Sequence, residues 1–292
     1  MVGVSVSSRA AADLIELTKP RIILMVMLTV AAGFWMASPS TQHGLLLFHV
    51  LLGTVLVAAG TNALNQVAER DLDALMRRTR SRPLPAGRLD VATAAALAWL
   101  SGISGVVYLA AWVNSIVATL AAVTLVSYVF GYTPLKRHSS VATLVGAIPG
   151  ALPIVGGWAA ATGGLESQAW ALFAILFLWQ LPHFLSLGWL YREDYARADV
   201  KTLSTNDSDG RRTFRYACLY AAALLPVSLV PTLIGITGGV YFFGAVLLSS
   251  AFLYVSSVAA RSTTGSNARR LFTCSLVYLP LLLVLMVVNR VA

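Results

Sequence analysis

Nine long apolar runs constrain the fold of this chain more than any other feature. Each approaches the roughly 20 residues that an α-helix needs to cross about 30 Å of hydrocarbon. The runs occupy 22–37, 45–64, 91–112, 115–132, 141–161, 168–190, 214–235, 239–260 and 271–289. Hydrophobic residues make up 58% of the 292 residues and charged residues only 11%, which excludes a soluble globular domain. We therefore predict an all-α, polytopic membrane protein with nine transmembrane helices.

The distribution of basic residues predicts how these helices are oriented. Lys and Arg are retained on the cytoplasmic side of a membrane during insertion. Twenty of the 21 basic residues fall in the N-terminal segment and in the loops on its side, and only Arg290 lies at the opposite end. We expect a cytoplasmic N-terminus and an extracytoplasmic C-terminus, in a bacterial or archaeal plasma membrane.

The first twenty residues carry charged side chains and no apolar core of the signal-peptide type, so we expect no cleavage. We divide the chain into a cytoplasmic N-terminal segment, 1–20, and a single transmembrane domain, 21–292. The net charge of +9 follows from the one-sided basic loops. It indicates membrane lipid headgroups or an anionic substrate at the inner face, and no nucleic acid.

Acidic residues gather in two stretches, 65–73 and 192–199, at the cytoplasmic ends of the second and sixth runs. These stretches contain six of the twelve carboxylates in the chain. Clustered carboxylates repel one another, and a bound cation offsets that repulsion whereas lipid does not. The pattern predicts a site for a divalent metal and a phosphate group.

The first acidic stretch has a helical period. If the second run continues as a helix, then Asn65, Glu69 and Asp73 project from one face, spaced about 6 Å apart. Oxygen ligands at that spacing suit Mg²⁺, which completes its shell with water and phosphate oxygens. Asp71 lies about 200° from Glu69 around the same helix and is expected to pair with Arg70 or with another base.

A basic loop, residues 77–88, follows this acidic stretch directly. Its guanidinium groups can bind phosphate through two hydrogen bonds each, whereas the acids alone would repel it. The cytoplasmic bias of basic residues, together with salt bridges, also explains these charges. It does not explain the order of amide, acids, arginines and prolines.

One face of the sixth run is polar, which a lipid-facing helix would not be. Gln180, His183, Tyr191 and Asp194 lie within about 80° of one another on a helical wheel. His183 either makes a hydrogen bond within the bundle or faces a cavity, where it can ligate iron or orient a substrate. Asp199 lies about 140° from Asp194, so the two share a metal only if the helix ends between them.

Glycines and prolines are concentrated in the fifth run, between residues 146 and 157. Small residues four apart allow helices to approach closely in lipid, and prolines break a helix where other groups satisfy the freed carbonyls. Two interpretations remain open: a packing face with a kink, or a bent wall beside a substrate cavity.

Taken together, these motifs resemble the UbiA superfamily of intramembrane prenyltransferases. The resemblance rests on Asn65-x-x-x-Glu69-x-x-x-Asp73, the Arg-Thr-Arg-Ser-Arg-Pro run at 78–83, residues 132–137 and the second acidic stretch. It spans nearly the whole chain. Within the superfamily, residues 69–83 and 178–184 are most similar to the protohaem IX farnesyltransferases.

The resemblance implies a nine-helix bundle around a central cavity, with farnesyl diphosphate bound through Mg²⁺ at the cytoplasmic mouth. It implies transfer of the farnesyl group to a vinyl group of haem B, with a downstream haem-modifying enzyme or oxidase as a further partner. Asn65, Glu69 and Asp73 would form one metal–diphosphate site and Asp194 would anchor another. The further candidates are Arg77, Lys136, Arg137, Gln180, His183, Tyr191 and Arg192, and around them Asp71, Arg80, Arg82, Tyr132, Asp199 and Lys201.

Two features depart from the superfamily pattern. Glu69 stands where the superfamily more often has Asp, and residues 198–203 replace a stretch that usually contains proline. Two other functions stay open. A sister prenyltransferase acting on an aromatic or quinone precursor would share the metal site. A transporter would share the many spans and intramembrane polar residues, although both acidic stretches lie on one side rather than at the midplane.

Overall fold

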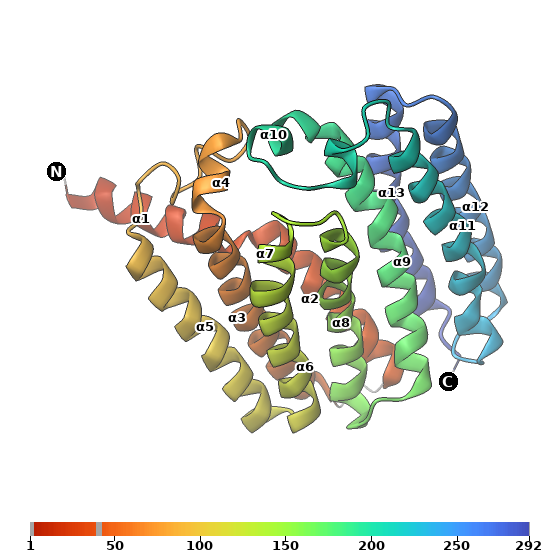
Figure 1. The fold of residues 1–292 in the computed structure, drawn as a ribbon. Coiled ribbons are helices and arrows are strands. Elements are labelled where there is room, and N and C mark those ends of the chain that lie inside the picture. Colours follow the sequence, from red (N-terminus) through yellow and green to blue (C-terminus); the bar gives the residue numbers. More distant parts are fainter. Residues whose placement is uncertain (1–2, 39–42, 292) are drawn as a thin grey trace.

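In the computed structural model, residues 3–38 and 43–291 are described, with side chains from residue 10 onward. Its helical segments pack side by side, and the short segments α4 and α10 lie at one end (Figure 1). In chain order they are α1 (Gly3–Thr18), α2 (Pro20–Ala37), α3 (Gly44–Ala68), α4 (Arg70–Leu75), α5 (Val91–Trp112), α6 (Ser115–Val126), the π-helix η2 (Ser127–Tyr132), α7 (Thr133–Leu135), α8 (Ala142–Thr162), α9 (Ser167–Leu190), α10 (Arg192–Arg197), the 3₁₀ helix η3 (Leu203–Thr205), α11 (Arg211–Leu233), α12 (Gly239–Arg261) and α13 (Gly265–Val288).

Within the described residues, nine of these helices are long and apolar enough to span a membrane, with α6, η2 and α7 counted as one. The predicted all-α class and the nine spans are confirmed. Most boundaries agree with the apolar runs to within three or four residues. The main difference is α13, which begins at Gly265 rather than at residue 271. Its first turns are polar because they extend beyond the apolar layer, and hydropathy alone does not detect them.

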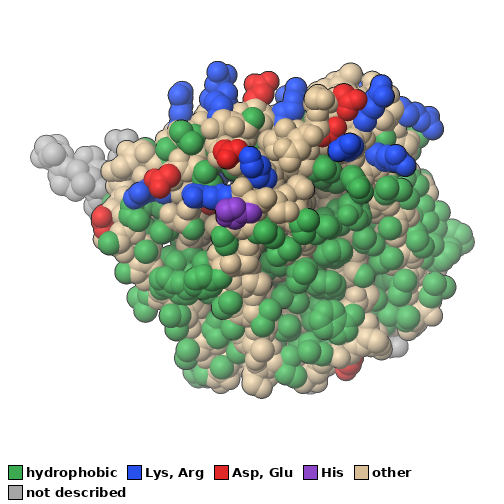
Figure 2. All heavy atoms as spheres, in the orientation of Figure 1, with side chains coloured by type: hydrophobic (Ala, Val, Ile, Leu, Met, Phe, Trp, Pro, Cys, Tyr) green, Lys and Arg blue, Asp and Glu red, His purple; other side chains and the backbone are tan. Residues whose placement is uncertain are grey.

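Charged side chains and apolar side chains occupy different parts of the surface. Figure 2 shows Lys, Arg, Asp and Glu gathered at the end that carries α4 and α10, above a broad apolar band. Large apolar side chains of α12, such as Phe243, Leu247 and Tyr254, are exposed. A soluble protein would bury them, whereas a lipid bilayer solvates them. The chain is a multi-pass membrane protein.

Glycine allows α2 and α8 to pack backbone to backbone near the middle of the bundle. A Cβ at Gly33 would lie 2.1 Å from the Ile154 carbonyl oxygen, and one at Gly157 would lie 2.0 Å from the Val30 carbonyl oxygen. Such small residues provide the close contact that helix pairs in lipid rely on. This packing holds α8 at the centre of the bundle, against α2.

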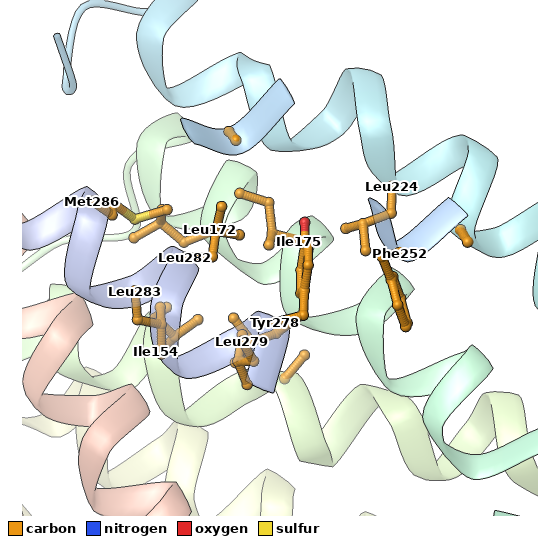
Figure 3. Packing of buried hydrophobic residues seen from close by; sticks show 14 of the residues in the cluster. Ile154, Leu172, Ile175, Leu224, Phe252, Tyr278, Leu279, Leu282, Leu283 and Met286 are labelled. Atoms are coloured by element: carbon orange, nitrogen blue, oxygen red, sulfur yellow. The ribbon is translucent and has the colours of Figure 1, made fainter. Parts of the chain in front are cut away.

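The helices α9, α11, α12 and α13 form a well-packed block (Figure 3). Ile175, Leu224 and Phe252 are fully buried there, and the Phe252 ring stacks on Tyr278 at a centroid distance of 5.1 Å. The Tyr278 hydroxyl is satisfied by a hydrogen bond to Ser249 Oγ at 2.9 Å. This block supports α9, whose other face borders the central cavity.

Candidate active site

The bundle encloses two adjoining chambers, which we call the apolar chamber and the polar chamber. The apolar chamber has a volume of about 510 Å³ and lies among α2, α3, α6, α8, α9 and α13. The polar chamber has a volume of about 220 Å³. Its lining includes residues of the first acidic stretch, of the basic loop and of the segment 195–204. The two share five lining residues, which are Ile22, Tyr128, Tyr132, Phe184 and Leu187. The predicted central cavity is confirmed.

The helix α8 forms one wall of the apolar chamber. Its lining residues include the small and cyclic side chains of Gly146, Pro149, Gly150, Pro153 and Gly156. Of the two interpretations of this segment, its position beside a cavity is confirmed, but α8 continues as a helix through Pro149 and Pro153. That the cavity holds a substrate stays a prediction. The same residues also allow close packing, since a Cβ at Gly146 would lie 2.5 Å from the Tyr132 ring.

Asn65, Glu69 and Asp73 all line the polar chamber. The expectation of an unbroken helix is wrong, because α3 ends before Glu69 and α4 begins after it. The helical hydrogen bonds nevertheless continue across this junction. The Glu69 N–H donates to the Asn65 carbonyl at 3.0 Å, and the Asp73 N–H donates to the Glu69 carbonyl at 2.8 Å. The four-residue period is therefore preserved and the three side chains face one chamber, while exposed Asp71 pairs with Arg70 at 3.0 Å.

Each of these three side chains has its own cationic partner. The contacts are Lys19 Nζ to Asn65 Oδ1 at 2.8 Å, Lys136 Nζ to Glu69 Oε1 at 2.7 Å and Arg82 Nη1 to Asp73 Oδ2 at 2.7 Å. Asp73 is almost fully buried, with an exposed fraction of 1%. A buried carboxylate needs such a partner, because an unpaired charge there would cost several kcal/mol.

Lys19 belongs to the site although the sequence reasoning used it only for topology. It has a left-handed backbone (φ 56°) and directly precedes Pro20, at the start of α2. Burial, together with the neighbouring charges of Arg82 and Lys136, lowers the pKa of Lys19 to about 7. The signal that could have identified it is a basic residue next to the proline that begins a span.

The basic loop sends only some of its arginines into the polar chamber. Arg82, which is partly buried, and Arg78, which is exposed, line it, whereas the exposed Arg77 and Arg80 lie outside the lining. The Arg78 guanidinium lies over the Tyr191 ring, 4.8 Å from its centre. The sequence analysis named Arg77 and not Arg78. It could not tell them apart, because loop residues have no period that reveals which side chains turn inward.

Arg137 and Arg192 also lie outside the chamber lining. Arg137 is exposed, and the Arg192 guanidinium stacks on Trp189 at 4.4 Å while donating to the Trp189 carbonyl at 3.1 Å. Tyr191 also lies outside both chamber linings, and its ring packs against the Arg78 guanidinium. Within the polar stripe of the sixth run, only Gln180 and His183 reach the apolar chamber.

The π-helix η2 carries two tyrosines at the boundary between the chambers. Tyr128 and Tyr132 line both of them, with their ring centres 4.9 Å apart. The Lys136 ammonium lies 4.3 Å from the centre of the Tyr132 ring and so contacts an aromatic face and the Glu69 carboxylate together. Single π-turns in a helix frequently mark functional sites.

Asp194 has contacts that differ from those predicted for a metal ligand. Its carboxylate accepts the backbone N–H groups of Arg77 at 3.0 Å and Arg78 at 3.4 Å, and it pairs with Arg197. Burial raises the pKa of Asp194, but the hydrogen bonds from Arg197 and from the two backbone N–H groups outweigh it and leave the pKa below its ordinary value. The structure therefore brings Asp194 to the basic loop and not into the lining of the polar chamber.

Asp199 follows the end of α10 and is exposed. It has a left-handed backbone (φ 50°) and pairs with Lys201 at 2.6 Å. Although the helix ends between Asp194 and Asp199, as sharing a metal requires, the two carboxylates have separate partners. Lys201 lines the polar chamber, and its N–H donates to the Lys136 carbonyl at 2.8 Å.

The donor atoms in the polar chamber suit a hard cation bound with an anion. Among the described residues there is no cluster of three His, Cys, Asp or Glu side chains. The amide of Asn65 and the carboxylates of Glu69 and Asp73 form an oxygen-only set, which favours Mg²⁺ completed by water and phosphate oxygens. The chamber lining carries five basic side chains beside these two carboxylates, and they are Lys19, Arg78, Arg82, Lys136 and Lys201.

The fold and the site define a class of membrane enzyme. An apolar chamber of this size can accommodate apolar groups, and the charged chamber beside it suits an anionic group. The model of the UbiA prenyltransferase family matches residues 26–282. The chain belongs to this family.

Relatives cover nearly the whole chain. It is 47% identical over 287 residues to a protein of Solibacter usitatus named protoheme IX farnesyltransferase, with 95% of this chain and 98% of the relative covered. Proteins with the same name from Koribacter versatilis and Salinibacter ruber are 42% and 45% identical; they cover 95% of this chain, and 93% and 98% of their own lengths are matched.

Solved structures share the fold at low identity. A digeranylgeranylglyceryl phosphate synthase has a TM-score of 0.81 at 16% identity, covering 96% of this chain and 98% of its own. A UbiA homolog from Archaeoglobus fulgidus bound to DMAPP and Mg²⁺ has a TM-score of 0.69 at 16% identity, covering 94% of this chain and 99% of its own. At this identity the likeness establishes the arrangement of the helices.

Proposed function

We propose that this enzyme transfers the farnesyl group of farnesyl diphosphate to a vinyl group of haem B, giving haem O and diphosphate. The observation that carries the proposal is the polar chamber, with its oxygen ligands and cations, adjoining an apolar chamber of about 510 Å³. The identity of 47% to a protoheme IX farnesyltransferase over nearly the full length selects haem as the acceptor.

In this proposal Asn65, Glu69 and Asp73 hold Mg²⁺, which neutralises the diphosphate and assists its departure when bound. Their present partners are Lys19 on the Asn65 amide oxygen and Lys136 and Arg82 on the two carboxylates, and in this proposal they turn to the phosphate oxygens when the substrate binds. Arg78 and Lys201 line the same chamber and add positive charge. Such groups, already oriented toward developing negative charge, lower the barrier most when water is excluded.

The bond between C1 of the farnesyl group and the diphosphate oxygen breaks, and its electron pair leaves with the diphosphate. The terminal vinyl carbon of haem then bonds to C1, and water adds to the inner vinyl carbon with loss of one proton. The apolar lining protects the allylic cation from premature attack by water. Tyr128 and Tyr132 lie at the chamber boundary, where the reacting carbons would meet.

Asp194 acts in this proposal as a positioning residue. Its hydrogen bonds to the Arg77 and Arg78 backbone hold the loop that carries Arg78 and Arg82. We propose this supporting role in place of the second metal–diphosphate anchor that the resemblance implied. We further propose that the active site opens to the cytoplasm of a bacterial or archaeal cell, since 20 of the 21 basic residues fall in the N-terminal segment and in the loops on its side.

The test is an assay of the purified, detergent-solubilised chain with haem B, farnesyl diphosphate and Mg²⁺, with EDTA as control. Extracted haems are separated by liquid chromatography and identified by mass spectrometry. We expect a metal-dependent product with the mass of farnesyl hydroxyethyl haem. Binding of farnesyl diphosphate without any modified haem would instead favour an aromatic or quinone acceptor. A protein that does not bind the diphosphate would contradict the prenyltransferase proposal.

A further inference from the structure

His183 is a histidine within a membrane-spanning helix that the proposed diphosphate chemistry does not use. It lies on α9 and lines the apolar chamber. Its chain neighbour Phe184, and Leu187 one turn further along, line both chambers. A group bound at His183 therefore sits within about one helical turn, roughly 5 Å, of the boundary where the diphosphate chamber begins.

The hydrogen bonds around His183 determine which ring nitrogen carries the proton. Ser275 Oγ lies 2.8 Å from His183 Nδ1 and 2.6 Å from the Phe272 carbonyl oxygen. A carbonyl oxygen only accepts, so the single hydroxyl proton of Ser275 must point toward Phe272. Ser275 then has only lone pairs to offer, and Nδ1 of His183 is the protonated nitrogen. Nε2 is left with a lone pair.

Aromatic rings hold the imidazole in this orientation. The ring centres of Trp179 and Phe272 lie 5.3 Å and 4.9 Å from that of His183, at interplanar angles of 25° and 30°. Trp179 Nε1 donates to the Ser275 carbonyl at 2.8 Å and so ties α9 to α13 at this point. A residue needed only for packing between these helices would not require a fixed tautomer.

Nε2 of His183 is the ring nitrogen that is left available. It has no hydrogen-bond partner among the described residues, and it is absent from the buried, unpartnered polar atoms of that part of the chain. His183 is also one of the residues that line the apolar chamber. A neutral imidazole with an available lone pair in an apolar cavity is a ligand for a transition metal.

We propose that Nε2 of His183 coordinates the iron of the haem acceptor and thereby places a vinyl edge of the porphyrin at the boundary between the chambers. The inference rests on the proposed function, since it takes haem as the substrate. The Nδ1–Ser275–Phe272 chain plays the part that second partners play for metal-bound histidines, fixing the tautomer and the ring plane. The apolar surroundings of the macrocycle come from α2, α3, α6 and α8.

The decisive measurement is the resonance Raman spectrum of the ferrous haem B complex of the purified full chain. We expect a band from the iron–histidine stretch in the wild type, its loss in His183→Ala, and its return when imidazole is added to that variant. His138→Ala is the matched control, because His138 is exposed and lies outside both chamber linings. A wild-type spectrum without the band overturns the inference, and so does a band that persists in His183→Ala.

Affinity for metal-free protoporphyrin IX separates coordination from packing. We expect His183→Ala to weaken haem B binding strongly and metal-free protoporphyrin binding little. Ser275→Ala should weaken haem B binding by about tenfold, because it removes the partner that fixes the tautomer. Equal losses for both porphyrins would overturn the inference and assign His183 to packing. Unchanged metal-free binding also shows that the variants fold.

The turnover assay keeps this inference separate from the proposed function. If the wild type converts haem B to the farnesylated product without an iron–histidine band, only the coordination by His183 fails. If the wild type binds farnesyl diphosphate but neither binds nor modifies haem B, both the coordination and the haem acceptor fail.

Discussion

The two acidic helices α4 and α10 are built alike but placed differently. Each has six residues and follows a membrane helix after a single junction residue, Glu69 or Tyr191. In both, helical hydrogen bonds cross the junction, from Asp73 N–H to Glu69 and from Tyr195 N–H to Tyr191. Yet α4 directs its inward carboxylate into the polar chamber, whereas α10 directs Asp194 to the backbone of the basic loop.

This difference shows that a cluster of carboxylates at a membrane surface does not by itself define a metal ligand. The partner decides the role. Asp73 meets a side-chain cation, Arg82, that can move to a ligand. Asp194 also pairs with a side-chain cation, Arg197, but in addition it accepts two backbone N–H groups of the basic loop, which makes it a support for that loop in our proposal. We expect variants of Asp73 on α4 to impair binding of the metal and diphosphate, and variants of Asp194 on α10 to affect the position of the basic loop.

The largest effect is expected for Asp73→Asn. Removing the charge that faces the polar chamber should lower turnover by on the order of 10²-fold or more, because a preorganised electrostatic contact is lost. Turnover is measured by the haem assay, and folding by size-exclusion chromatography. Asp71→Asn is the matched control on the same helix, since Asp71 is exposed. Similar activities of the two variants would remove Asp73 from the site.

Lys136→Met should weaken farnesyl diphosphate binding by about tenfold or more, as expected for loss of a charge-assisted hydrogen bond. Binding is measured by isothermal titration calorimetry in the presence of Mg²⁺. Arg137→Met is its neighbour and control, because Arg137 is exposed outside the lining. If Arg137→Met weakened farnesyl diphosphate binding more than Lys136→Met does, the ammonium group of Lys136 would stay with Glu69 when the substrate binds.

Asp194→Asn should act through the basic loop. Weakened hydrogen bonds to the Arg77 and Arg78 N–H groups should destabilise this loop locally by roughly 1–3 kcal/mol. We expect faster amide hydrogen exchange at 77–82, and a loss of turnover smaller than that of Asp73→Asn. Binding of Mn²⁺ with the diphosphate, followed by electron paramagnetic resonance, should persist. Loss of Mn²⁺ binding in this variant would show that Asp194 is a metal ligand.

The stabilisation of the basic loop by the Asp194 carboxylate depends on pH. The pKa of Asp194 is lower in the folded protein than its ordinary value, so its contribution is present above about pH 4 and is lost as the pH falls through the folded pKa. The difference in melting temperature between the wild type and Asp194→Asn should be constant near neutral pH and shrink in acid. A difference that grows as the pH falls would contradict this assignment.

The smallest effect is expected for Asp199→Asn. Asp199 is exposed, and an exposed ion pair such as that with Lys201 contributes about 0.5 kcal/mol or less. Melting temperature and turnover should both stay close to those of the wild type. A clear loss of metal binding would show that residues 198–203 move toward the polar chamber when the substrate is bound.

Much of the site could be predicted because it follows from local periods. The four-residue spacing of Asn65, Glu69 and Asp73 placed them on one face, and the junction at Glu69 did not disturb this, because its backbone hydrogen bonds remain helical. The same reasoning correctly predicted that Asp71 lies off this face, where it pairs with Arg70. It failed for Arg77 and Arg78, since a loop has no period that shows which side chain turns inward.

The sequence by itself determined the nine spans, the all-α class and the face that carries the first set of oxygen ligands. These depend on hydropathy and on the rise of the helix, which act over a few turns. The tertiary structure decided which cation meets which acid and which proton His183 keeps. Lys136 and Glu69 are 67 positions apart, Arg77 and Asp194 are 117 apart, and His183 and Ser275 are 92 apart. Such contacts exist only after the helices pack, because no local spacing in the chain brings these partners together.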